Sequence, residues 1–455
     1  MKFAKLITLL CGALILAACD SDNNRNNIDE EFFALQVLHA SPDAPPVNVF
    51  VDGVEVLSNV DYKQGSAKLG LSVRDLPYRI RVDAITSGGD VTVIGPAELN
   101  FEADTVYTIA AVGGVASGTL APAVISQPDT AVGAGAARLF VLHGAEAAPT
   151  VDVFVTAPGA DLTAEAPVGT FAFGETIGPA EVPAGDYQVR VTPAGVPGTV
   201  VYDSGTVTLG DGNDFVVTAV PNTAATATSS PISLVLSTGS GTAELRDVNA
   251  PTGLRIGHLS PDTPEVDVVV NGGVYLADVP YPAVTDFAPL PADTYNVAVQ
   301  AAGNPGVVPI GPVDLTLEAG TFYKVLAVNF FSSIEAWILT DDPRPIATDA
   351  KVRILHASPT AQDVDIYLTA PGAGIADADP TLASVPFQAN TGYLALPAGD
   401  YDVTVTLPGT KDVAIGPATI SIENGGVYTA IARDPLPGET EFGLIVLNDG
   451  FPVEE

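Results

Sequence analysis

The chain has few cysteine, methionine, tryptophan, histidine and basic residues. Its 455 residues include 2 cysteines, 1 methionine, 1 tryptophan and 4 histidines, and its 54 acidic and 18 basic residues give a formal charge of −36. A surface this negative repels nucleic acid and anionic lipid headgroups, so neither is an expected partner. Two cysteines cannot supply a disulfide framework or a cysteine metal site, and no cofactor is expected.

The N-terminus has the pattern of an export signal. Two lysines precede a short apolar stretch, and small residues then lead to Cys19. This stretch is shorter than the roughly twenty residues that a membrane-spanning helix needs. The pattern resembles the bacterial lipobox, which implies cleavage after residue 18 and acylation of Cys19, for example by palmitate. The alternative is an ordinary signal peptide with an incidental cysteine. We expect a lipid anchor at Cys19 and a place in the cell envelope, on the periplasmic face of a membrane or at the cell surface.

The remaining composition predicts an all-β protein. Glycine (44) and proline (38) are abundant, only 16% of residues are charged, and 47% are hydrophobic. Such a chain is too apolar to be disordered. Short stretches of Val, Ile, Thr and Tyr alternate with turn-forming Pro, Gly and Asp, which indicates strands rather than helices.

One motif occurs four times. Its first copy, V-L-H-A-S-P-D at 37–43, leads into the alternating strand V-N-V-F-V at 47–51. A turn that feeds another strand, P-A-G-D-Y-Q-V-R-V at 183–191, recurs in the third and fourth copies and is shortened in the first. The motif contains all the histidines, His39, His143, His258 and His356, and the second residue of the following strand is Asn48, Asp152, Asp267 or Asp365.

The spacing of the motif predicts four domains. The histidines are 104, 115 and 98 residues apart, so each repeat is long enough to bury its own core. Six to eight short antiparallel strands per repeat indicate an immunoglobulin-like or transthyretin-like β-sandwich. Four such domains in line would form a rod on the order of 130 Å long. We expect a signal peptide at 1–18, a flexible tether at 19–34, sandwiches at 35–136, 137–252, 253–350 and 351–455, and boundary stretches at 131–137, 238–253 and 340–350.

These motifs together resemble the bacterial domain of unknown function 4397 family. The resemblance rests on V-L-H-A-S-P-D-A-P, on the V-D-V strand and on P-A-G-x-Y-x-V, and it covers almost the whole mature chain. It implies exported or surface-attached β-sandwich proteins, often in tandem, and it implies no activity. The second copy departs most, because Ala145 and Glu146 replace the Ser-Pro pair.

The motif contains the residue types of a nucleophilic or metal site. The third module has His258, Ser260 and Asp267, and a triad needs a histidine that is oriented by a carboxylate and lies near a hydroxyl. However, Asn48 replaces the aspartate in the first module and Ala145 replaces the serine in the second, whereas the histidine persists. One histidine per module also cannot build a multi-histidine zinc site. We therefore expect no catalytic and no metal-binding residues.

Strand alternation supports a structural role for these histidines. Leu35, Val37 and His39 share one face of their strand and Gln36 lies on the other, as Arg255 does in the third module. The imidazole is expected to point inward at the strand end and to bond backbone groups of the following turn. We interpret the Asn or Asp of the next strand in the same way.

Two acidic stretches and the tryptophan have ordinary interpretations. Residues 211–214 (D-G-N-D) and 341–342 (D-D) resemble calcium-binding turns, but no twelve-residue calcium loop with its closing glutamate is present. Asp and Asn are common in turns, so we interpret both stretches as turns. Trp337 is expected in a core.

The leading functional hypothesis is a non-catalytic, lipid-anchored envelope protein that is structural, adhesive or ligand-binding. Its expected partners are the membrane, through the anchor, and an envelope protein or a glycan. The alternatives are a periplasmic scaffold subunit that works by oligomerisation or strand addition, and a metal-dependent or hydrolytic enzyme that uses the histidine motif.

Overall fold

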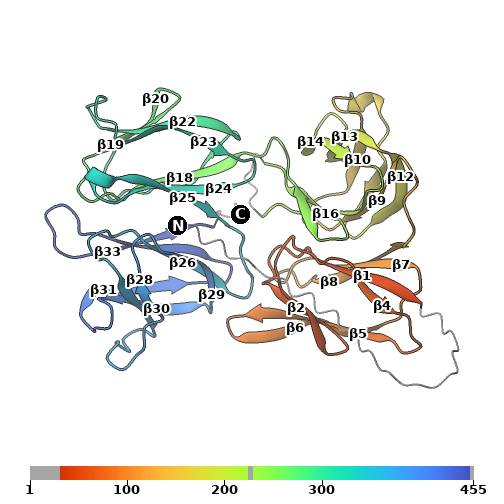
Figure 1. Ribbon diagram of the computed structural model, residues 1–455, viewed down its shortest axis with the longest axis horizontal. Helices are drawn as coiled ribbons and strands as arrows, with labels where there is room; N and C mark the ends of the chain where they lie inside the picture. Colours follow the sequence, from red (N-terminus) through yellow and green to blue (C-terminus); the bar gives the residue numbers. More distant parts are fainter. Residues whose placement is uncertain (1–30, 224–228, 451–455) are drawn as a thin grey trace, which may run out of the picture.

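The computed structural model describes residues 31–223 and 229–450, and within them 33 strands form eight sheets (Figure 1). The only helices in this part of the chain are the single 3₁₀ turns η1 (Leu162–Ala164) and η2 (Phe331–Ser333). The expected all-β fold with four tandem sandwiches is confirmed. No helix in the described ranges is long and apolar enough to cross a membrane. The predicted signal peptide and Cys19 lie outside the described residues.

Each module consists of two sheets. We call the sheet with the histidine strand the inner sheet and the other the outer sheet. Module 1 has the inner sheet β4 (Leu69–Ser72), β1 (Phe32–His39), β7 (Thr105–Val112), β8 (Ala121–Pro128) and the outer sheet β3 (Val54–Val60), β2 (Val47–Val51), β5 (Tyr78–Thr86), β6 (Gly89–Leu99). Module 2 has the inner sheet β12 (Thr176–Pro183), β9 (Ala136–His143), β15 (Asp214–Pro221), β16 (Ile232–Ser237), β17 (Thr242–Leu245) and the outer sheet β11 (Gly169–Phe171), β10 (Val151–Thr156), β13 (Gly185–Pro193), β14 (Tyr202–Leu209).

The second half of the chain repeats this order. Module 3 has the inner sheet β21 (Ala288–Leu290), β18 (Thr252–His258), β24 (Phe322–Val328), β25 (Glu335–Asp341) and the outer sheet β20 (Gly273–Val279), β19 (Val266–Val270), β22 (Asp293–Ala301), β23 (Ile310–Leu317). Module 4 has the inner sheet β29 (Asn390–Leu396), β26 (Ala350–His356), β32 (Val427–Arg433), β33 (Gly443–Asn448) and the outer sheet β28 (Leu382–Val385), β27 (Val364–Thr369), β30 (Gly399–Thr406), β31 (Val413–Ile422).

One strand pair per module differs from the expected antiparallel pattern. In module 1, β1 runs parallel to β7, with Val37 opposite Ile109, and the other three modules repeat this pairing. The other pairings are antiparallel. Between β1 and β7 the chain crosses to the outer sheet and returns. A tight hairpin would make two strands antiparallel, but this long connection allows β7 to run parallel to β1.

The histidine strands are buried on both faces. Leu35 packs in the core of module 1, as the alternation predicts, and the strand burial extends to Leu38 on the opposite face. In module 4, every residue of β26 is buried. Apart from one or two polar residues, the residues before each histidine are apolar or small on both faces of the strand, as expected for a strand that is covered on both sides.

The inner sheets cover each other in pairs. Leu38 and Val112 of module 1 belong to the same buried cluster as Phe140 and Leu142 of module 2. Modules 3 and 4 share a second cluster, to which Leu326 and Leu355 belong, and Trp337 packs against it. Each fully buried leucine contributes about 2 kcal/mol relative to exposure. Each pair of inner sheets therefore encloses one continuous core that spans two modules.

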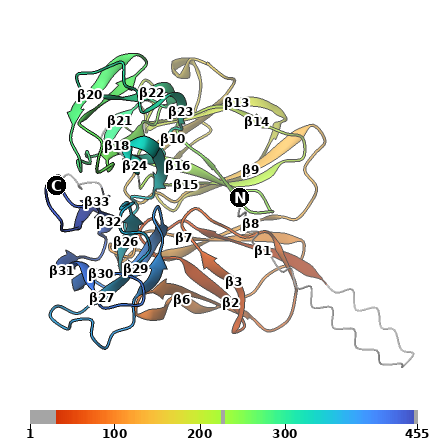
Figure 2. The same cartoon turned by 60° about the vertical axis from the view of Figure 1, so that its left-hand side comes forward.

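The predicted rod is wrong. The four modules form a two-by-two block, with the pair of modules 1 and 2 beside the pair of modules 3 and 4 (Figures 1 and 2). A rod would leave the second face of every inner sheet in water. Because that face carries aliphatic side chains in all four modules, pairing the sheets removes it from water and decides the shape.

The interface between modules 3 and 4 also contains buried charges. Lys324 lies 3.1 Å from the Asp449 carboxylate and 3.4 Å from that of Asp341. Arg255 of module 3 binds Asp449 at 2.5 Å, and Arg353 of module 4 binds Asp341. The two Arg–Asp pairs occupy equivalent positions and cross the interface in opposite directions, as in a twofold dimer.

The linker from module 3 to module 4 joins the two pairs. Arg344 lies in it and is 4% exposed. Its guanidinium donates to the carbonyl oxygens of Pro42, at 3.4 Å, and Ala44, at 2.9 Å, and it pairs with Asp61 at 2.5 Å, all in module 1. Farther along the linker, Asp349 accepts a hydrogen bond from the amide of Ser87 at 3.0 Å.

Candidate functional site

The four motif histidines bind the main chain in the same way. Each Nε2 lies within hydrogen-bond distance of the carbonyl oxygen six residues later, just before the second strand of its module. A carbonyl oxygen can only accept, so Nε2 carries the proton. The acceptors and distances are Pro45 at 3.1 Å, Pro149 at 3.4 Å, Pro264 at 3.1 Å and Gln362 at 2.6 Å.

The other ring nitrogen is also used in three modules. Nδ1 of His143, His258 and His356 accepts the amide N–H two residues later, at 3.3, 3.4 and 3.3 Å. Nδ1 of His39 is buried without a hydrogen-bond partner. In these three modules the imidazole therefore spans the bend between the first and second strands, with no lone pair free for a metal.

Burial keeps these imidazoles neutral. It lowers the pKa of all four below the ordinary value of 6.5, although the carbonyl partners act in the opposite direction. Three of the rings also meet an aromatic ring edge to face, with centroids 6.2 to 6.3 Å apart. A neutral imidazole that is hydrogen-bonded to the main chain is suited to fixing a bend.

The serines of the motif do not face these histidines as nucleophiles. Ser260 Oγ lies 2.5 Å from Thr263 Oγ1, and Ser358 Oγ donates to the carboxylate of Asp434. Ser41 Oγ is buried without a hydrogen-bond partner. A triad needs a hydrogen bond between the hydroxyl and the imidazole. In modules 3 and 4 the serine hydroxyl instead bonds a threonine or an aspartate.

The Asn or Asp after each motif lies on the face of its strand that points away from the module core. Asn48 Oδ1 accepts the amide of Asn59 at 3.0 Å, and Asp267 accepts that of Asp278 at 2.9 Å. Asp152 accepts the Gly195 amide at 2.7 Å, and Asp365 accepts those of Ser384 and Gly409 at 2.8 and 2.7 Å. These side chains hold neighbouring strands and turns of the outer sheet, and they are not brought together with the histidines.

The two acidic stretches bind protein groups. Asp211 accepts the Gly135 amide at 2.7 Å, and Asp214 binds Arg138 at 2.8 Å. The expectation that 341–342 forms a turn is wrong for Asp341, which ends β25 and whose carboxylate enters the charge network with Lys324. Within residues 31–223 and 229–450, no group of three or more His, Cys, Asp or Glu side chains is placed to hold a metal ion.

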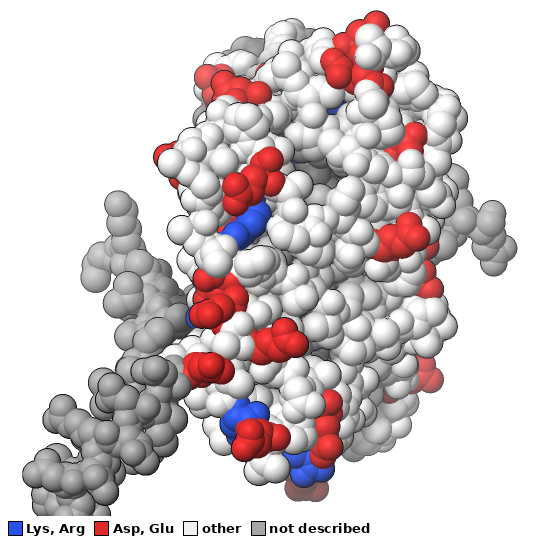
Figure 3. Space-filling view, turned by 90° about the vertical axis from the view of Figure 1, so that its right-hand side faces the viewer, with Lys and Arg blue, Asp and Glu red and all other residues white. Residues whose placement is uncertain are grey.

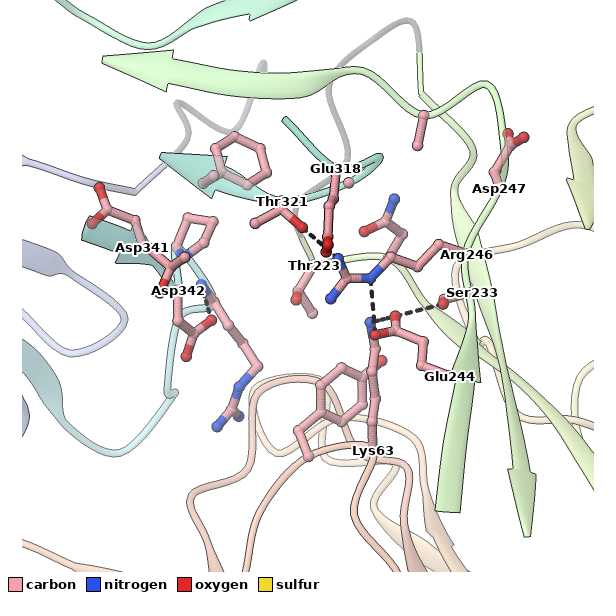
Figure 4. A pocket seen from close by; sticks show the side chains of 18 of the residues that line it. Lys63, Thr223, Ser233, Glu244, Arg246, Asp247, Glu318, Thr321, Asp341 and Asp342 are labelled. Atoms are coloured by element: carbon pink, nitrogen blue, oxygen red, sulfur yellow. Dashed lines mark hydrogen bonds and ion pairs between the residues drawn. The ribbon is translucent and has the colours of Figure 1, made fainter. Parts of the chain in front are cut away.

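A cavity of about 460 Å³ lies where modules 1, 2 and 3 meet the linker to module 4. Lys63 and Glu244 reach it from modules 1 and 2, and Glu318 and Thr321 from module 3 (Figure 4). Arg344 of the linker completes the wall. The volume falls in the range of small-molecule sites, and the site exists only because the modules are folded together.

Paired charges organise the wall. Glu244 binds Lys63 at 2.6 Å, Ser233 at 2.6 Å and Arg246 at 3.1 Å, and Arg246 continues to Thr321 at 2.6 Å. Burial alone would raise the pKa of Glu244, but Lys63 and the hydrogen bonds lower it to about 2. Burial raises the pKa of Asp247 in the same wall. In total, six carboxylates line the cavity (Asp61, Glu244, Asp247, Glu318, Asp341 and Asp342) against three cations (Lys63, Arg246 and Arg344).

The residues of the cavity and of the charge network were not predicted. The sequence did contain a signal, because Arg255, Lys324 and Arg353 each interrupt an apolar strand. We placed Arg255 on the face opposite the module core, which is correct, but that face is covered by another module. Which module covers it is a property of the tertiary structure alone.

The fold and the four equivalent histidines define a tandem β-sandwich repeat protein. The family model described as Domain of unknown function (DUF4397) matches residues 33–154, 252–367 and 370–453, well over half of the chain. The chain therefore belongs to this family. The matched segments leave out most of module 2, the copy whose motif departs most. No curated protein is similar enough to the chain to count as a match.

Proposed function

We propose that the chain is a non-catalytic, lipid-anchored cell-envelope protein whose four modules form one binding block. The observation that carries the proposal is the hydrogen bond from Nε2 to a main-chain carbonyl oxygen in all four modules. It gives the most conspicuous chemical residue of the repeat a structural task. The signal pattern that ends at Cys19 supports the anchor and the envelope location.

The cavity supports a binding role for a small polar cation. Asp61, Glu244, Asp341 and Asp342 are ion-paired with basic residues, and Asp247 and Glu318 add negative charge to the wall. The aromatic rings of the wall, Tyr62 and Phe322, are 8% and 3% exposed, so they offer no platform on which a sugar ring would stack. The chemistry of the wall therefore favours an aliphatic amine over a glycan.

Two measurements test this function. Metal analysis and an ester- and peptide-hydrolysis panel on the purified protein should show neither stoichiometric zinc nor turnover. An activity lost in His258→Ala and His356→Ala while both variants remain folded would establish the enzyme alternative.

Titration calorimetry tests the cavity. Spermidine and 1,5-diaminopentane should bind at one site per chain, and Glu318→Gln should weaken the binding about tenfold, as expected for one charge-assisted contact of about 1.4 kcal/mol. Glu98→Gln, on the exposed surface, is the matched control. Equal binding by both variants would remove the cavity from the proposal.

A further inference from the structure

The four modules differ at one edge of the inner sheet. The strand that follows the parallel strand in each module is β8, β16, β25 or β33. One residue of this strand lies opposite a core-facing residue of the parallel strand and thus on the core side of the sheet. The equivalent pairs are Val124 and Ile109, Leu236 and Val217, Ile338 and Val325, and Val446 and Ala430.

Only module 2 covers this residue. Leu236 is 8% exposed, whereas Val124, Ile338 and Val446 are 49%, 48% and 45% exposed. The difference comes from β17, which pairs antiparallel with β16 and places Ala243 opposite Leu236. Within the described ranges β8, β25 and β33 are the last strands of their sheets.

The added strand closes the open side of the sandwich. Leu245 of β17 lies opposite Leu234 and packs against the core of module 2. Its carbonyl oxygen accepts a hydrogen bond at 3.0 Å from the hydroxyl of Tyr202, which belongs to the outer sheet. Four residues in extended conformation thus join both sheets and cover the apolar edge.

This strand does not belong to the repeated fold. It lies in the stretch 238–253 between modules 2 and 3, ahead of β18. Within residues 31–223 and 229–450, modules 1, 3 and 4 form their sandwiches without an equivalent strand. Module 2 is therefore a built-in example of the edge with an extended segment seated on it.

The three open edges are not equally protected. Prolines at 122 and 128 stand near both ends of β8, and proline has no N–H to offer to an added strand. Neither β25 nor β33 contains proline. β33 (G-L-I-V-L-N) contains no charged residue, and the charged residues of β25, Glu335 and Asp341, stand at its two ends. Apolar edges without charge or proline are the kind that accept another strand.

We propose that β33 and its equivalent β25 bind an extended segment of a partner polypeptide by strand addition. The segment would place an aliphatic residue over Val446 or Ile338, as β17 does over Leu236, with polar residues at alternate positions. It would be neutral or basic, because the formal charge of −36 repels acidic chains, including a second copy of this one. The binding goes beyond the proposed function and does not use the cavity.

The probe is a fluorescein-labelled peptide that copies residues 240–247 with the change Glu244→Lys. It should bind the mature protein in fluorescence polarisation and protect the amides of 443–447 and 335–339 from hydrogen exchange. The variant with both Ile338→Lys and Val446→Lys should bind at least tenfold more weakly. The control variant Val124→Lys changes an equally exposed residue of the proline-flanked edge. It should bind the peptide with the same affinity as the unchanged protein.

Folding and self-association are followed in the same samples. All three positions are exposed, so urea midpoints of the variants should match the parent, and a peptide with the change Leu245→Pro should not bind. Absence of binding to the unchanged protein would overturn the proposal. So would binding that Ile338→Lys and Val446→Lys leave intact, or a dimer that forms through β33 and excludes the peptide.

Discussion

The guanidinium of Arg344 donates a hydrogen bond of 2.9 Å to the carbonyl oxygen of Ala44, 300 residues earlier in the chain. It is one of several contacts that hold the linker between modules 3 and 4 on module 1. The same arginine also lines the central cavity, so one side chain contributes both to the shape of the block and to its candidate binding site.

Replacing Arg344 by alanine should loosen the block. The change leaves two module 1 carbonyl oxygens and Asp61 without their partner, and it should cost about 2–4 kcal/mol of unfolding free energy. We expect a larger radius of gyration in small-angle scattering, since the two pairs of modules can then separate. Arg79→Ala is the control, because its ion pair with Glu98 has both side chains more than 60% exposed and should contribute under about 0.5 kcal/mol. An unchanged radius and midpoint in Arg344→Ala would contradict the role of this contact.

Replacing Asp449 by asparagine should weaken the interface between modules 3 and 4. Asp449 is fully buried and receives Arg255, Lys324 and the Tyr393 hydroxyl, the last at 3.0 Å. Removing one charge of a buried network costs about 3–5 kcal/mol, because its partners stay buried without compensation. Urea denaturation measures the loss, and exposed Asp75→Asn should be neutral. A cost below about 1 kcal/mol would mean that the network does not hold the interface.

Stability should fall as the solution becomes acidic. The folded-state pKa of each motif histidine lies below the unfolded value of about 6.5, so below that pH the unfolded chain takes up protons first. The stabilisation is complete above pH 6.5 and is lost as the pH falls toward the folded pKa, at up to about 1.4 kcal/mol per pH unit for each histidine. In denaturation curves between pH 7 and 5, His258→Gln should show a slope smaller by one such contribution. An identical slope would place the pKa of His258 near its ordinary value.

Loss of a motif imidazole should destabilise one module without affecting any metal content. His258→Ala leaves the Pro264 carbonyl oxygen and the Ser260 amide unpaired next to a cavity, and it should cost about 2–4 kcal/mol. His39→Ala should cost less, because its Nδ1 has no partner to lose. Thermal unfolding ranks the variants, and the opposite order would contradict this explanation.

Replacing Cys19 by serine should release the protein from the membrane. The lipobox-like sequence offers this cysteine as the acylation site, and several acyl chains anchor a protein stably because each buried methylene contributes about 0.8 kcal/mol. Labelled palmitate should be incorporated by the parent and not by Cys19→Ser, and the variant should move to the soluble fraction. Membrane retention of an unlabelled variant would indicate another means of attachment.

Short-range features of the structure could be predicted well. The alternation around Leu35, Val37 and His39 placed the imidazole on the core side, because side chains in a strand alternate between faces whatever lies beyond them. The same reasoning placed Arg255 on the opposite face but gave no neighbour for it. A pattern of alternation reports which residues share a face, and the partner of that face can be water or another module.

The sequence by itself determined the all-β modules, their fourfold repetition and the histidine strand, since alternation, turn residues and motif spacing are local properties of the chain. Only the tertiary structure decided that the inner sheets pair, that Arg344 returns to module 1, and that β17 covers one edge while β25 and β33 stay open. Those outcomes depend on burying apolar faces and pairing charges between segments hundreds of residues apart, and such contacts leave no fixed spacing in the chain.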